Sequence, residues 1–212
     1  MNVAVLGATG RTGRNLVTEL LARGHNVAVL VRDPARLDPA SASRVRVVIG
    51  DSRTPADLDQ LLTGTDAVIS ALGPTGKEPA LHRDTAAALI PAMTAAGITR
   101  FVGISGAGID APGDQKSNGA KIISWLIQNI GRAVAADKRH ELDLITASDL
   151  DWTLVRPPRL QDGPATGHVE HDAHRSTAST RITRGDLAVF LADCLDQDLY
   201  PPQAPFVATA RT

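Results

Sequence analysis

Three glycines near the start of the chain, Gly7, Gly10 and Gly13, have the spacing of a loop that binds a dinucleotide. They follow an apolar run at 3–6 that predicts a buried strand, and they lead into a helical pattern at 16–21. The first glycine allows a sharp turn, the second lets the backbone approach a pyrophosphate, and the third lets the helix pack on the sheet. The helix N-terminus offers unpaired N–H groups to phosphate oxygens. Glycines placed between a strand and a helix therefore predict a dinucleotide site.

Further apolar runs alternate with helical patterns along the whole chain. We expect strands at 27–31, 45–49, 67–72, 101–104 and 152–155, and an edge strand at 206–208. Helices are expected at 58–62, 79–96, 121–148 with a break at Gly131, and 185–196. The apolar runs are continuous, as in parallel strands that helices cover on both faces. The sequence predicts an α/β fold: a doubly wound, Rossmann-type parallel sheet in one domain, 1–212, with 161–212 completing the substrate side.

Composition narrows the class of protein. The 212 residues are 43% hydrophobic and 21% charged, with a formal net charge of −1, which argues against a nucleic acid or an anionic membrane as partner. Cys194 is the only cysteine, so an internal disulfide is excluded. No apolar run approaches the roughly 20 residues that span a bilayer. We expect a cytoplasmic protein, either a monomer or a small homo-oligomer.

The residues after the second predicted strand bear on the choice of cofactor. An acid at this position usually bonds the adenosine ribose of NAD, whereas an arginine suits the 2′-phosphate of NADP. Here the strand ends in Arg32, with Arg36 one turn further on and Arg11 in the glycine loop. This pattern favours NADP(H) over NAD(H). Two alternatives stay open: Asp33 could turn inward and favour NAD, and Arg36 could be a solvated charge.

Other strand ends supply polar groups and glycines to the same edge of the sheet. Asp51 could accept a hydrogen bond from the adenine amino group, or it could serve a turn or cap the next helix. Gly73 would let the cofactor pass close to the backbone. Ser105 should face the nicotinamide, where it could hold the carboxamide or bond the substrate; the alternative is an ordinary turn serine. The glycine-containing segment 106–118 is expected to be a mobile loop.

One absence is informative about catalysis. The only tyrosine is Tyr200, and no lysine follows it at helical spacing. The chain therefore lacks a Tyr-x-x-x-Lys acid–base pair of the kind used in ketone reduction. His168, His171 and His174 recur at three-residue spacing, which makes a metal site conceivable but scatters the rings over different faces of an extended segment. We expect a polar surface there and no metal, and Cys194 as a core residue.

Five motifs in the right order resemble the atypical short-chain dehydrogenase/reductase superfamily, specifically the NAD(P)-binding proteins grouped with biliverdin-IXβ reductase/flavin reductase and the NmrA-like proteins. They are Gly7-Ala-Thr-Gly-Arg-Thr-Gly13, Val29-Leu-Val-Arg32-Asp33, Gly50-Asp51, Asp66-Ala-Val-Ile-Ser-Ala-Leu-Gly73 and Leu150-Asp-Trp-Thr-Leu-Val-Arg-Pro-Pro158. The motifs are specific for fold and cofactor and say little about substrate. The loop after Ser105 carries few apolar groups, which argues against biliverdin itself.

The resemblance implies a role for each matching residue. The pyrophosphate would lie against Thr9, Arg11 and Thr12, and the 2′-phosphate against Arg32, supported by Arg36. The remaining contacts of the cofactor would be Asp51 and Ser52 at the adenine, Leu72 and Gly73 at the nicotinamide ribose, Ser105 beside the nicotinamide, and Pro157, Pro158, Arg159 and Leu160 on its far side.

The leading hypothesis is an NADPH-dependent reductase that passes hydride to a flavin, a quinone or a similar small acceptor. Such acceptors can take their proton from water, so the missing tyrosine is tolerable. General acid catalysis typically contributes about 10²–10⁴-fold, which a ketone reductase could hardly lose. The alternative is a redox sensor of the NmrA-like type that binds NADPH and acts through a protein partner. An epimerase ranks lower, because it usually needs the Tyr-Lys pair. An open apolar pocket beyond the nicotinamide would favour the reductase. A pocket filled by residues 106–118 would favour the sensor.

Overall fold

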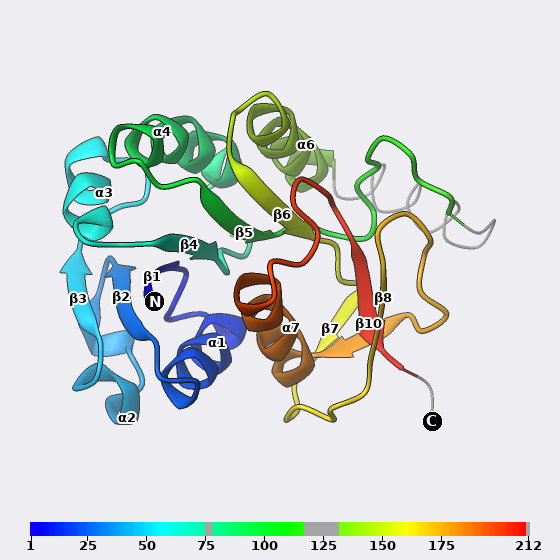
Figure 1. Ribbon diagram of the computed structural model, residues 1–212, viewed down its shortest axis with the longest axis horizontal. Helices are drawn as coiled ribbons and strands as arrows, with labels where there is room; N and C mark the ends of the chain where they lie inside the picture. The colour runs from blue at the N-terminus through cyan, green and yellow to red at the C-terminus, as the bar shows by residue number, and fades with distance from the viewer. Residues whose placement is uncertain (75–77, 117–131, 211–212) are drawn as a thin grey trace.

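The computed structural model describes residues 1–74, 78–116 and 132–210. Its centre is a six-stranded parallel sheet with the strand order β3-β2-β1-β4-β5-β6 (Figure 1). The strands are β1 (Asn2–Leu6), β2 (Asn26–Val31), β3 (Arg46–Ile49), β4 (Ala67–Ser70), β5 (Arg100–Ile104) and β6 (Asp151–Val155). The strand order reverses between β1 and β4, which places the ligand crevice of such a sheet at their carboxyl ends. The predicted Rossmann-type fold is confirmed.

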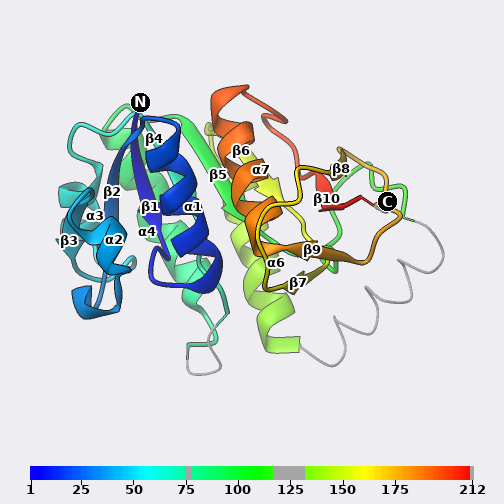
Figure 2. The same cartoon turned by 90° about the horizontal axis from the view of Figure 1, so that it is seen from below.

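Helices cover both faces of this sheet (Figures 1 and 2). One face carries α1 (Arg11–Ala22) and α7 (Arg184–Asp196), and the other carries α3 (Pro55–Leu62), α4 (Leu81–Ala95) and α6 (Arg132–Thr146). Two short elements follow β2: the 3₁₀ helix η1 (Pro34–Arg36) and α2 (Pro39–Ala42). In the part of the chain described, no helix has the length and apolar character needed to cross a membrane.

The side chains of each strand alternate between two hydrophobic clusters, one on each face of the sheet. In β1, Val3 and Val5 pack in the cluster with α1 and α7, whereas Ala4 and Leu6 pack in the cluster with α3, α4 and α6. Successive side chains of a strand point to opposite faces, so both sides of a buried strand must be apolar. This is the physical reason for the continuous apolar runs in the sequence.

The C-terminal quarter contains more regular structure than the sequence predicts. β7 (Arg159–Gln161) pairs in parallel with β9 (Arg181–Thr183), and β8 (Val169–Asp172) pairs antiparallel with β10 (Phe206–Thr209). Both pairs lie beyond β6, at the end of the sheet opposite β3 (Figure 2). The pattern missed β7, β8 and β9 because each is short and consists mostly of polar, partly exposed residues, so none forms an apolar run. The predicted helix at 121–148 corresponds to α6, and its part before Arg132, including the break at Gly131, lies outside the described residues.

Buried charges anchor residues 106–116, the described part of the segment expected to be a mobile loop. Arg156, only 1% exposed, donates through Nη1 and Nη2 to the carboxylate of Asp114, at 2.7 and 2.6 Å. Its guanidinium carbon lies 3.8 Å from the ring centroid of Phe206. Lys116 donates from Nζ to the carbonyl oxygens of Ala107 and Ile109. These contacts therefore hold residues 106–116 against the rest of the protein, although the segment contains several glycines.

Candidate functional site

The glycine loop between β1 and α1 packs closely against neighbouring backbone and leads into the N-terminus of α1. Gly7 has a φ of +78°, and a Cβ added to it would lie 2.7 Å from the backbone of Ala71. A Cβ added to Gly13 would overlap the carbonyl oxygen of Gly7. Gly10 is the N-cap of α1, and no side chain within the described residues caps that end. The unpaired N–H groups of α1 therefore fit a pyrophosphate, as the sequence predicts.

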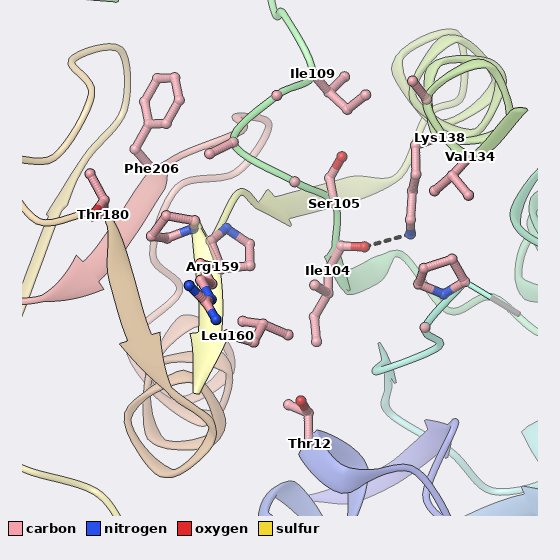
Figure 3. Close-up of a pocket in the computed structure, with 18 of the residues that line it drawn as sticks. Thr12, Ile104, Ser105, Ile109, Val134, Lys138, Arg159, Leu160, Thr180 and Phe206 are labelled. Atoms are coloured by element: carbon pink, nitrogen blue, oxygen red, sulfur yellow. Dashed lines mark hydrogen bonds between the residues drawn. The ribbon is translucent and has the colours of Figure 1, made fainter. Parts of the chain in front are cut away.

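A cavity of about 660 Å³ opens at the carboxyl ends of β4, β5 and β6 (Figure 3). Half of the predicted site residues line it: Thr12, Leu72, Gly73, Ser105, Pro157, Pro158, Arg159 and Leu160. Lys138 reaches in from α6 on one side, while Arg159 and Leu160 of β7 lie on the other. Beyond Ser105 the wall is formed by Ile109, Val134 and Phe206 together with threonines and serines of 176–180. The volume suits one aromatic ring system beside another.

Ser105 is a polar residue in the wall of this cavity, and the hydrogen bonding of its hydroxyl group needs an explanation. The residue is 9% exposed, and its backbone N–H donates to the carbonyl of Val155 at 2.8 Å. Its hydroxyl is buried and has no hydrogen-bond partner in the described part of the protein. A turn serine would bond a nearby backbone group, and a buried hydroxyl without a partner is costly. The orphaned hydroxyl therefore fits a bound nicotinamide or substrate.

Lys138 lines the same cavity, although no pattern in the sequence pointed to it. Its ammonium group, nearly buried, donates to the carbonyl of Ile104 at 2.6 Å and to Glu141 at 2.8 Å. Lys138 stands four residues after Val134, which also lines the cavity. This is the Tyr-x-x-x-Lys spacing with an apolar residue in the tyrosine position. The sequence does not mark this lysine, because its place in the cavity depends on how α6 packs.

Apart from Thr12, the residues predicted for the adenosine and phosphate end lie outside this cavity. Arg32, directly after β2, donates to both carboxylate oxygens of Glu78 at 2.9 Å. The carboxylate of Asp33 accepts from the N–H of Ala35 and caps η1, so it is engaged locally. Arg36 is exposed at the end of η1. The acid that would favour NAD thus has a structural role here.

The other predicted contacts have the following partners. Arg11 is exposed and pairs with Asp162 at 3.1 Å, and Thr9 is half-buried in the glycine loop. The hydroxyl of Ser52 is buried against that of Thr85, at 2.7 Å. None of these contacts tests whether the residues bind a cofactor, so the assignments stay predictions.

Asp51 binds the guanidinium of Arg53. It accepts from Nε and Nη2 at 2.8 and 2.6 Å, and from the backbone N–H of Arg53 at 3.0 Å. These hydrogen bonds hold the pKa of the Asp51 carboxyl below its usual value. Of the two structural alternatives, the turn is confirmed and the helix cap is wrong, because Thr54 is the N-cap of α3. A contact with adenine remains a prediction.

Behind the cavity wall, α4 and α6 are joined by a buried pair. Asp137 accepts from the backbone N–H groups of His82 and Arg83 and lies 2.8 Å from Nδ1 of His82. Burial opposes ionisation of Asp137, but the two backbone N–H donors and the His82 side chain together outweigh it, and its pKa is lowered. Burial, with Lys138 nearby, also holds the pKa of His82 below 6.5, against the attraction of Glu141 and Asp137. Both groups keep their neutral-pH forms as the pH falls.

The lowered pKa of His82 predicts a pH dependence of stability. The unfolded chain binds the proton of His82 from about pH 6.5 downwards and the folded protein does not, so the free energy of unfolding should fall below that pH. One group contributes at most about 1.4 kcal/mol per pH unit. We expect His82→Asn to lose this contribution, as measured by urea unfolding at about pH 7.5 and 5.5. The matched control is the exposed His140→Asn; equal slopes in the His82 variant and the wild type would contradict the assignment.

The histidines at 168, 171 and 174 lie close together in the sequence, but in the described part of the protein they do not form a group that could hold a metal ion. His171 on β8 places Nδ1 2.6 Å from the hydroxyl of Tyr200, and the ring of His174 lies against Gly113. Across the residues that the structure describes, no three potential ligands of this kind come together to hold a metal ion. Cys194 is buried in the core, and burial raises the pKa of its thiol to about 12.

Comparison with known proteins agrees with this geometry. The model of a family described as NAD(P)H-binding matches residues 7–198. The chain is 29% identical over 206 residues to "Uncharacterized sugar epimerase YhfK" of Bacillus subtilis, covering 93% of this chain and 89% of that protein. It is 33% identical over 212 residues to the 3-diazoavenalumate denitrifying reductase of a Streptomyces species, covering 88% of this chain and 64% of that protein.

A solved short-chain dehydrogenase/reductase from Veillonella parvula, in complex with NADP, shares the fold. Its TM-score is 0.83 at 20% identity, covering 98% of this chain and 94% of that one. The predicted resemblance to NAD(P)-binding atypical reductases is confirmed at the level of the family. A matching family model over most of the chain, a Rossmann sheet and a glycine loop in close contact with its neighbours lead to one conclusion: the chain belongs to the NAD(P)H-binding family.

Proposed function

We propose that the protein is an NADPH-dependent reductase that delivers hydride to a flavin, a quinone or a similar small acceptor. The observation that carries the proposal is the cavity of about 660 Å³ beside Ser105, walled by Ile109, Val134 and Phe206. Residues 106–109 line this space without filling it. An open, largely apolar space of ring size supports a reductase over a sensor whose loop occupies the site.

The chain's own residues would position two rings. The backbone of the glycine loop with Thr9, Arg11 and Thr12 would hold the pyrophosphate, and Leu72 and Gly73 would border the nicotinamide ribose. Bound NADPH supplies a hydride. Ser105 would fix the carboxamide, and the wall from Pro157 to Leu160 would exclude water from the far side. Holding the reactants in near-attack geometry is the main catalytic contribution that such a site can make.

The lining of the cavity supports an acceptor that needs no proton donor from the protein. Val134 takes the position that a tyrosine would occupy four residues before Lys138, and the ammonium group of Lys138 is bound to Ile104 and Glu141. A flavin or quinone accepts hydride readily and can take its proton from water. The same lining argues against an epimerase, in spite of the relative that carries that name.

The net charge of the chain bears on the class of its partner. The net charge of −1 favours neither a nucleic acid nor an anionic membrane as partner. We propose a small-molecule acceptor as the partner, a cytoplasmic location, and a monomer or small homo-oligomer as the working form.

The direct test follows NADPH absorbance with purified protein, supplying a flavin and then a simple quinone. Turnover well above the uncatalysed rate, reduced by Arg32→Ala at limiting NADPH, would support the reductase. Tight NADPH binding without turnover with either acceptor would contradict it and favour the redox sensor.

Ser105→Ala should lower turnover by about tenfold with little change in NADPH affinity, because one hydrogen bond contributes about 0.5–1.5 kcal/mol. Turnover and binding are measured separately, by absorbance and by cofactor fluorescence. Ser148→Ala is the control, because that hydroxyl bonds the carbonyl of Ile145 at the C-terminal end of α6. Unchanged turnover in the Ser105 variant would remove this hydroxyl from the mechanism.

A further inference from the structure

Two arginines from different loops meet at one carboxylate outside the cavity. Arg32 Nη1 and Arg53 Nη2 each lie 2.9 Å from Oε1 of Glu78. The two carboxylate oxygens of Asp51 accept from Nε and from the same Nη2 of Arg53. We call Arg32, Arg53, Asp51 and Glu78 the arginine clamp. Its two guanidinium groups converge on a position that a single anionic oxygen occupies.

The clamp lies where a dinucleotide places its adenosine ribose. β2 and β3 are neighbouring parallel strands, so their carboxyl ends meet at one edge of the sheet. Arg32 is the first residue after β2, and Arg53 lies in the turn between β3 and α3. In this fold the ribose 2′-position lies beside the end of the second strand. The sequence pattern indicates Arg32 for this position and assigns Arg53 no role.

The charges of the clamp sum to zero while Glu78 is in place. Two guanidinium groups are balanced by the carboxylates of Asp51 and Glu78, so the clamp has no net positive charge for a phosphate. With the side chain of Glu78 turned away, Arg32, Arg53 and Asp51 together carry a net charge of +1. Arginine pairs that converge on one group are suited to phosphate recognition.

We propose that Arg53 is a second ligand for the 2′-phosphate of NADP(H), and that Glu78 is the internal carboxylate that this phosphate displaces. The inference rests on the proposed preference for NADPH and deepens it: specificity would be set by an exchange of anions and not by Arg32 alone. Asp51 would be a positioning residue that holds the guanidinium of Arg53 in place.

The exchange predicts opposite effects for two substitutions. Arg53→Ala should weaken NADPH binding about three- to tenfold and leave NADH binding within twofold, since charge-assisted hydrogen bonds are strong but these groups are partly exposed. Glu78→Gln should tighten NADPH binding by a similar factor, because it removes the competing charge and keeps the shape of the side chain. A gain in affinity cannot arise from a protein that fails to fold.

The measurement is the dissociation constant of each cofactor by fluorescence, together with calorimetry of the fragments 2′,5′-ADP and 5′-AMP. Neither depends on turnover. Arg83→Ala is the matched control, because Arg83 is an exposed arginine in the first turn of α4 that pairs with Asp84 instead of Glu78. It should change the affinity for 2′,5′-ADP by less than about twofold.

The outcomes separate this inference from the proposed function. If the wild type prefers NADPH and Arg53→Ala does not change that preference, or Glu78→Gln fails to strengthen it, the clamp is wrong and the reductase proposal stands. If the wild type has no preference but Glu78→Gln acquires one, the clamp is supported and the proposed NADPH preference is wrong. If neither the wild type nor Glu78→Gln distinguishes the cofactors, both are wrong.

Discussion

Replacing Arg156 with alanine is expected to lower the free energy of unfolding by about 3–5 kcal/mol, the usual cost of removing one partner of a buried ion pair. The side chain is fully buried and donates to Ala204, to Ile109 and to both oxygens of Asp114. Alanine would leave the carboxylate of Asp114, 10% exposed, without this partner; among the described residues its remaining cationic partner is Lys116, at 3.9 Å. Urea unfolding measures the decrease.

Two further variants test whether the unpaired charge of Asp114 causes the loss of stability. Adding Asp114→Leu to Arg156→Ala should recover part of the stability, because the stranded charge is removed. Arg83→Ala breaks an exposed pair with Asp84 and should cost less than about 1 kcal/mol. A decrease below that value in Arg156→Ala would show that the buried pair does not anchor residues 106–116 to β6 and β10.

Gly13→Ala is expected to destabilise the protein and to weaken cofactor binding. Alanine normally stabilises a helix position relative to glycine, by up to about 1 kcal/mol. Here the added Cβ would overlap the carbonyl oxygen of Gly7, so the backbone of the loop must shift. Overpacking of this kind costs about 1–3 kcal/mol. Breaking one charge-assisted hydrogen bond to a phosphate weakens binding by roughly tenfold or more.

The sign of the stability change decides this prediction. Thermal unfolding and NADPH binding are measured on the same preparation. Gly106→Ala is the control for stability, because a Cβ there would meet no atom of the described residues within 4 Å. A stabilised Gly13→Ala protein that binds NADPH normally would show that α1 does not need to approach the loop so closely.

The sequence by itself determined the fold and one side of the site. Continuous apolar runs required strands buried on both faces, and the glycine spacing required a backbone that passes close to its neighbours. Because parallel strands end at one edge of the sheet, residues read off the strand ends had to gather there. Ser105, Leu72 and Pro157 do gather, around one cavity. These are consequences of local pattern and of the rules of parallel sheets.

Only the tertiary structure decided which charges meet. Asp114 and Arg156 are 42 residues apart. Arg53 lies between β3 and α3, whereas Glu78 lies between β4 and α4. The periodicity of the sequence does not reveal such pairs. An ion pair forms where two side chains from different elements meet, whereas periodicity describes the residues of one element. The same reason hid Lys138, whose place in the cavity depends on how α6 packs beside β5. Local sequence specifies elements and their ends, whereas the partners of buried charges follow from packing.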